Sequence, residues 1–147
     1  MPEKETLERA EEDKREGKSP STQAGEFVKE EMDHIREGKH GARSTKQAIA
    51  IGLSKARRAG VKLQAPKEGK ASEETRRQAK RELAKGGSKS KPSPKRSRAT
   101  SKALKREGHS AASKQSLSRQ TKMAASKRSK ASRSASAKKA AATRKRS

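Results

Sequence analysis

The sequence predicts an all-α protein of short helices with little core, followed by a disordered basic tail. Start and stop signals for helices bracket several segments of the first half. Only 26% of the 147 residues are hydrophobic, with one Phe and no Tyr or Trp, which limits the core that the chain can bury. The predicted helices span about residues 3–16, 20–37, 44–59 and 72–85.

The best-defined helix lies at about 44–59. Ser44 is a good N-cap, Gln47 stands three residues later in the capping-box position, and Gly60 is a typical helix stop. Between these signals lies the longest apolar pattern of the chain, formed by Ala48, Ile49, Ile51, Leu53, Ala56 and Ala59. Gly52 interrupts this pattern, and we expect it to weaken the helix and to let a neighbour approach closely.

The helix at about 20–37 is the natural partner of this central helix. Ser19-Pro20 is a favoured start and Gly38 a favoured stop. Its apolar residues recur at helical spacing: Ala24, Phe27, Val28, Met32 and Ile35. Because the connection between the two helices is short, we expect an antiparallel hairpin over residues 19–60, in which Ile49 and Leu53 meet Phe27, Val28 and Ile35.

The other two predicted helices carry mostly charged residues. The helix at 3–16 offers pairs of opposite charge at i and i+4, with Leu7 and Ala10 as its apolar side. The helix at 72–85 starts at Ser72 and ends at Gly86-Gly87.

The composition changes after residue 85. Residues 86–147 hold 20 Lys/Arg and one acid, Glu107, whereas residues 1–85 hold 21 bases and 16 acids. The sequence therefore predicts a small helical region at 1–85 and a disordered, low-complexity basic tail at 86–147.

Composition and spacing argue against several functions. The chain has no Cys, no apolar run long enough to span a membrane and no secretory signal at its start. No arrangement of residues predicts a catalytic site, so we expect no enzyme activity and no cofactor. His34 and His40, with Asp33 and Glu37, resemble metal ligands, but a solvated helix face explains them better, so the sequence predicts no metal site.

A net charge of +24 points to nucleic acid as the partner, because phosphates are the densest anions in a cell. The segment Ser93-Pro94-Lys95-Arg96 suggests a compact turn that presents two cations to a narrow groove. The tail resembles the basic tails of linker histones and bacterial histone-like proteins. The predicted phosphate contacts are Lys46, Lys55, Arg57, Arg58, Lys91, Lys95, Arg96, Arg98, Lys127, Arg128, Lys130, Arg133, Lys138, Lys139, Arg144, Lys145 and Arg146.

Residues 1–85 resemble a small bacterial and phage family that is known only as a domain of unknown function. The part most like it is Lys46-Gln-Ala-Ile-Ala-Ile51, followed by Gly52-Leu-Ser-Lys-Ala-Arg-Arg-Ala-Gly60. The resemblance implies a bacterial, cytoplasmic protein and brings no activity, cofactor or catalytic residue.

Two functions follow as hypotheses. The first is a DNA-binding, histone-like protein of the bacterial nucleoid that neutralises phosphates without reading sequence. The second is a helical protein-interaction module, with RNA or ribosome association as a variant of the first. In the second hypothesis a protein partner or another copy of the chain binds residues 19–60, through Phe27, Val28, Ile35, Ile49, Ile51 and Leu53. Ile51 in particular is left over once the hairpin has formed.

Overall fold

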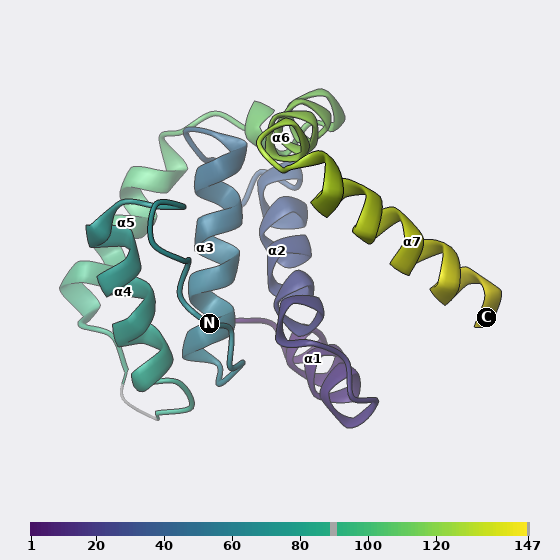
Figure 1. The fold of residues 1–147 in the computed structure, drawn as a ribbon. Helices are drawn as coiled ribbons and strands as arrows, with labels where there is room; N and C mark the ends of the chain where they lie inside the picture. The colour runs from purple at the N-terminus through teal and green to yellow at the C-terminus, as the bar shows by residue number, and fades with distance from the viewer. Residues whose placement is uncertain (89–90, 147) are drawn as a thin grey trace. The chain divides into compact units, whose positions relative to one another are not determined.

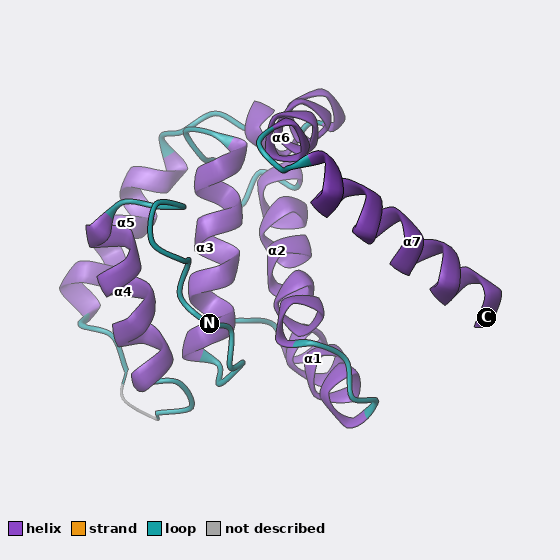
Figure 2. Cartoon of the chain, in the orientation of Figure 1, coloured by secondary structure: helices purple, strands orange, loops and turns teal. Residues whose placement is uncertain are grey.

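The computed structural model describes residues 1–88 and 91–146, and every regular element in these ranges is helical, as the sequence predicts (Figures 1 and 2). The elements are α1 (Lys4–Arg15), α2 (Pro20–Arg36), α3 (Thr45–Arg58), α4 (Glu73–Ala84), α5 (Pro94–Lys105), the 3-10 helix η1 (Ser110–Ala112), α6 (Lys114–Ser126) and α7 (Lys130–Arg146).

The chain divides into two compact units, residues 1–113 and residues 114–147. The first unit contains α1 to α5 and η1, and the second contains α6 and α7. The first unit therefore extends past residue 85, where the composition changes.

Serine caps start α2, α3 and α4 as the sequence predicts. Ser44 accepts a hydrogen bond from the backbone N–H of Gln47 at 3.1 Å, and Ser19 and Ser72 cap α2 and α4 in the same way. The side-chain oxygen of Gln47 accepts a hydrogen bond at 2.6 Å from the backbone N–H of Arg43, the residue before the N-cap. Gly60 follows α3 with φ +103°, a conformation that favours glycine.

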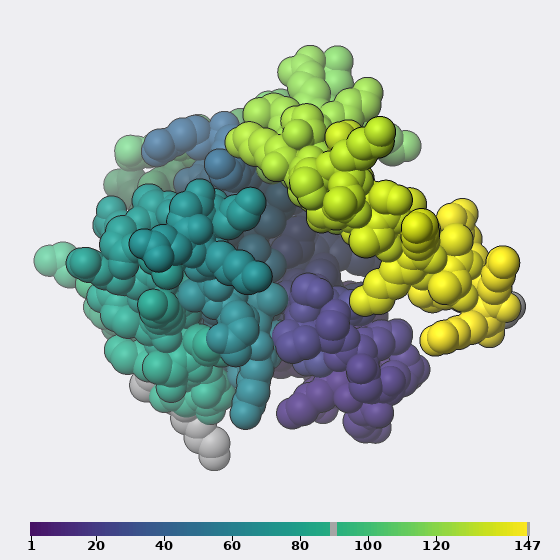
Figure 3. Space-filling view, in the orientation of Figure 1, coloured from purple at the N-terminus to yellow at the C-terminus, as the bar shows by residue number. Residues whose placement is uncertain are grey.

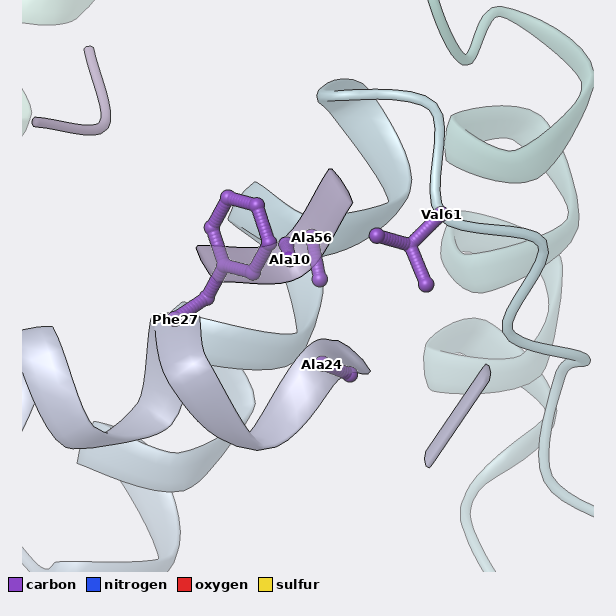
Figure 4. Packing of buried hydrophobic residues seen from close by; sticks show 5 residues of the cluster. All are labelled: Ala10, Ala24, Phe27, Ala56 and Val61. Carbon is purple, nitrogen blue, oxygen red and sulfur yellow. The ribbon is translucent and has the colours of Figure 1, made fainter. Parts of the chain in front are cut away.

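Helices α2 and α3 lie side by side and form the centre of the first unit (Figure 1). Figure 4 shows Phe27 of α2 packed with small side chains from α1, α2 and α3 and with Val61 just beyond α3. Leu53 and Leu63 pack against this cluster. The expected hairpin is confirmed, and its core is small because most of its members are alanines.

The segment after α5 docks on the turn between α2 and α3. The backbone N–H of Gly41 donates to the carbonyl oxygen of Leu104 at 2.9 Å, and that of Ala42 donates to Gly108 at 3.0 Å. Thr45 Oγ1 donates to the carbonyl oxygen of Ala111 at 2.6 Å. Four elements of the first unit thus converge on this turn: α2, α3, η1 and the end of α5.

The prediction that residues 86–147 are disordered is wrong for their described part, which forms α5, η1, α6 and α7. The prediction weighed the lack of apolar residues and gave too little weight to local propensity. Ala, Lys and Arg are strong helix formers, and each helical turn satisfies its own backbone polar groups. For residues 89, 90 and 147 the same prediction lies outside the described residues.

Candidate nucleic-acid interface

Exposed cations gather on the second unit. Residues 114–147 contain twelve Lys/Arg and no Asp or Glu, and all twelve of these side chains are exposed. Nine of the predicted phosphate contacts lie on this unit, and the structure leaves each exposed: Lys127, Arg128, Lys130, Arg133, Lys138, Lys139, Arg144, Lys145 and Arg146. In the first unit, Lys91 just before α5 and Lys95 in its first turn are also exposed.

Helix α7 carries cations on every side. At 100° per residue, the nine positions from Lys130 to Lys139 place these two side chains on opposite sides of the helix. Every residue of α7 is exposed, and its only apolar side chains are alanines (Figure 3, yellow). A helix of this kind has no face to bury against protein, and its charge can contact anions on more than one side.

Helix α5 presents a second, more compact basic surface. Arg98, Lys102, Lys105 and Arg106 line, with Ser101, a shallow depression of about 410 Å³. The sequence analysis named Arg98 and missed the other three cations. Their spacing of three and four residues along one helix was the signal that identifies a common face.

The Ser-Pro segment begins a helix and does not form a separate turn. Ser93 is the N-cap of α5 and Pro94 occupies its first turn, which is a favoured position for proline. Lys95 and Arg96 therefore lie in the first helical turn and are exposed. Cations at this end are disfavoured by the helix dipole, and a bound phosphate would relieve that repulsion.

The four predicted contacts on α3 divide into two groups. Lys46 and Arg58 are exposed. Lys55 instead forms an ion pair with the buried carboxylate of Glu31. Arg57 is buried and donates from Nε to the carbonyl oxygen of Leu63 at 3.1 Å, and burial lowers its pKa. Lys55 and Arg57 therefore hold the fold together and are not positioned to meet phosphate.

The predicted partner interface is also divided. Phe27 and Ile35 are buried in the first unit, so neither is available to a partner. Leu53 packs against the core cluster. Val28 faces Gly52, and Ile49 and Ile51 are half-buried.

A buried group of charged residues lies where α2 meets the turn after it. Glu31 is fully buried, Glu30 is 4% exposed, and the imidazoles of His34 and His40 lie beside Glu31. Glu3 accepts from His34 Nε2 at 2.9 Å and from Lys39 Nζ at 3.2 Å. These two hydrogen bonds, that from His34 first, lower the pKa of Glu3.

This group differs from the one considered on sequence grounds. Asp33 pairs with Lys29 and Arg36 on the surface, and Glu37 pairs with Lys39. The carboxylates that accompany the two histidines are Glu3, Glu30 and Glu31. Sequence reasoning missed Glu31, although its spacing of three residues from His34 places the two on one helix face.

Comparison with known proteins identifies a domain within the first unit. Residues 17–68 match the model of a family of unknown function, DUF6496. The DUF6496 domain spans α2, the turn, α3 and the segment that follows it. Neither a curated protein nor a solved structure matches the chain.

The limits of the DUF6496 domain separate the two sets of candidate residues. The buried charges on α2 and its turn lie within the domain, whereas Glu3, α5, α6 and α7 lie outside it. The match includes the Lys46–Ile51 string on which the sequence resemblance rests. Within the part of the chain that the structure describes, no helix is long and apolar enough to cross a membrane.

Proposed function

We propose that the chain binds nucleic acid through its phosphates, without reading base sequence, as a histone-like accessory protein of the bacterial nucleoid. The observation that carries the proposal is the second unit, which has twelve exposed cations and no Asp or Glu side chain. Phosphate contacts of this kind supply affinity and position but no sequence information.

The chemistry of α7 favours nucleic acid over a lipid surface. A helix that lies on a membrane needs an apolar face with residues such as Leu, Phe or Trp. Alanines are the only apolar residues of α7, and its cations surround the axis. A rod that is basic on all sides suits a polyanion that runs along it, or two polyanions that it bridges.

Duplex DNA is the proposed target because residues 86–147 contain no Phe, Tyr or Trp. Proteins that hold single strands usually stack bases on aromatic rings, which this region lacks. Contacts to duplex phosphates require only cations, and α5, α6 and α7 hold 15 of the 20 Lys/Arg of residues 86–147. Duplex RNA offers similar phosphates, so it is the alternative that the experiment includes.

The second candidate function is protein interaction, through a smaller surface of residues 19–60 than the sequence predicts. Since Phe27 and Ile35 are buried, a partner or second copy would contact the half-buried Ile49 and Ile51 of α3. This role predicts binding that survives changes in α7 and that depends little on salt.

A charge-matched pair of triple variants tests the proposal. The first replaces Lys138, Lys139 and Arg144 of α7 with Gln. The control replaces Lys4, Lys29 and Arg77, which form exposed i to i+4 ion pairs with Glu8, Asp33 and Glu73 in the first unit. Both variants lose the same formal charge, and the control pairs contribute little to stability.

Affinity for a labelled duplex DNA is measured over a range of salt concentrations by fluorescence anisotropy. The plot of log affinity against log salt loses about 0.9 in slope per lost phosphate contact, so the α7 variant is expected to be shallower by about 3. The control is expected to change by less than about 1. Equal slopes for the two variants would contradict the proposal, and parallel titrations with duplex RNA compare the two polymers.

A further inference from the structure

Glu31 has a buried carboxylate oxygen that accepts no hydrogen bond. Its side chain is fully buried in α2, and Oε1 pairs with Lys55 whereas Oε2 is left without a hydrogen-bond donor. An ionised carboxylate away from water requires a compensating partner at each oxygen. The Nε2 atom of His40 lies 3.1 Å from this Oε2 atom.

His40 places its Nε2 atom beside the buried carboxylate of Glu31. Its Nδ1 lies 2.9 Å from the carbonyl oxygen of Gly41, which can only accept, so Nδ1 carries the proton. In the neutral ring the lone pair is then on Nε2, which lies 3.1 Å from Glu31 Oε2 without a hydrogen bond between them. Two acceptors at this distance repel each other unless a proton or a metal ion lies between them.

His34 shows the same pattern on the other side of Glu31. Its Nε2 lies 2.9 Å from Glu3 Oε1, a carboxylate oxygen that also accepts from Lys39. The proton of a neutral His34 is therefore on Nε2, and the lone pair is on Nδ1, which lies 4.0 Å from Glu31 Oε1. Histidines that bind metals usually donate their other ring N–H to a carboxylate or a backbone carbonyl, as these two do.

We propose that Glu31, His34 and His40 bind a divalent transition-metal ion, for which Zn²⁺ is the best match. One ligand atom from each residue lies within 4.8 Å of the other two. Zn²⁺ binds His nitrogen at about 2.0–2.1 Å and carboxylate oxygen at about 2.0–2.2 Å, so small side-chain shifts close the site. The histidine side chains are 13% and 15% exposed, which gives an ion access and a water the fourth position.

The surrounding charges both help and oppose binding. Glu30 lies next to the site with 2% of its side chain exposed, and its Oε2 also accepts no hydrogen bond, so it adds negative charge. The ammonium group of Lys55 forms an ion pair with the Glu31 carboxylate, and its positive charge would repel a metal ion bound to the same carboxylate. Lys55 thus neutralises Glu31 in the metal-free chain and competes with the ion.

The site is independent of the nucleic-acid proposal. Its three ligands belong to the DUF6496 domain, on α2 and its following turn, whereas the proposed phosphate contacts are concentrated on α5 to α7. A bound ion would fix the turn at His40 to α2, next to the backbone of Gly41 and Ala42 where the α5–η1 segment docks.

Zn²⁺ titration of the full chain, purified without a histidine tag, tests the proposal by calorimetry. We expect one ion per chain, with affinity at least tenfold lower in His34→Gln and in His40→Gln. His109→Gln is the matched control, because His109 is the third histidine of the chain and is exposed outside the site. Circular dichroism confirms that each variant keeps its helices.

A Lys55→Gln variant keeps all three ligands and removes the competing ammonium group, so we expect it to bind Zn²⁺ more tightly than the unaltered chain. This variant keeps the proposal testable if a histidine variant loses its helices. Failure of the unaltered chain to bind Zn²⁺ would overturn the proposal. So would equal affinity in the folded His34 and His40 variants, or a Lys55→Gln variant that binds no more tightly.

Discussion

Gly52 shows how one absent side chain sets the contact between α2 and α3. A Cβ at this position would lie 2.7 Å from Val28 Cα and 3.0 Å from Val28 N, closer than packed atoms approach. The sequence analysis expected a close neighbour here, and the structure identifies it as the backbone of α2. The close approach compensates for the lower helix propensity of glycine at this site.

Replacing Gly52 with Ala is therefore expected to destabilise the first unit by about 1–3 kcal/mol, the usual cost of forcing an extra methyl group into a packed site. Gly25 of α2 is the control, because a Cβ there has no other atom within 4 Å. Gly25→Ala is expected to stabilise by about 0.5–1 kcal/mol through helix propensity alone. Urea unfolding followed by circular dichroism measures both, and effects of the same sign would contradict this account.

Residue-level signals also show what the sequence could and could not predict. The caps at Ser19, Ser44 and Ser72 were predictable, because each interaction is local. The roles of Lys55 and Arg57 were not, because their partners depend on how α2 and the segment after α3 fold against α3. A basic residue on a helix has the same sequence pattern whether it faces phosphate or a buried glutamate.

The docking of the α5–η1 segment is the contact between elements that sequence reasoning missed. Its bonds to the α2–α3 turn end on backbone carbonyl groups, and its apolar contribution is small: Ala111 and Ala112 are its buried hydrophobic residues. Every residue has a backbone carbonyl group, so residue types do not reveal which carbonyl groups accept such bonds. A segment whose one large apolar residue is Leu104 therefore appeared as a tail when only its composition was considered.

Thr45→Val tests whether this docking holds the turn. The change keeps the shape of the side chain but removes the hydroxyl that donates to Ala111, which leaves a buried carbonyl oxygen without its partner at a cost of about 1–3 kcal/mol. We expect local opening to expose the backbone N–H groups of Gly41 and Ala42, with hydrogen exchange about 5- to 150-fold faster.

Hydrogen exchange followed by NMR measures these two amides directly. Thr100→Val is the control, because Thr100 lies exposed on α5 away from the turn. Unchanged exchange at Gly41 and Ala42 in the Thr45 variant would show that the hydroxyl does not hold the segment in place.

The whole chain divides its charges between two uses. In the first unit many cations pair with acids, as in the bond of 2.7 Å from Arg9 to Glu26 that joins α1 to α2. The second unit has no Asp or Glu, so its twelve cations have no acidic side chain of the same unit to pair with. Ion pairs therefore lie in the first unit, whereas the charged side chains of the second unit are all cations.

For the whole molecule, the sequence predicted that the protein is all-α and that residues 86–147 are basic. It did not predict that residues 86–147 form helices. The helical class follows from periodic apolar residues and caps in residues 1–85, which are strong local signals. Helices α6 and α7 lack both a wide apolar face and acidic residues in their first turns, so nothing but propensity distinguishes them from disordered chain.

The central claim is that the chain binds nucleic acid by neutralising phosphates, and the salt dependence of its affinity for duplex DNA tests this most directly. If about ten phosphates are neutralised, log affinity falls against log salt with a slope near −9. That value is the prediction for the full chain. A slope shallower than about −3 would mean that few phosphates are contacted, and it would contradict the claim.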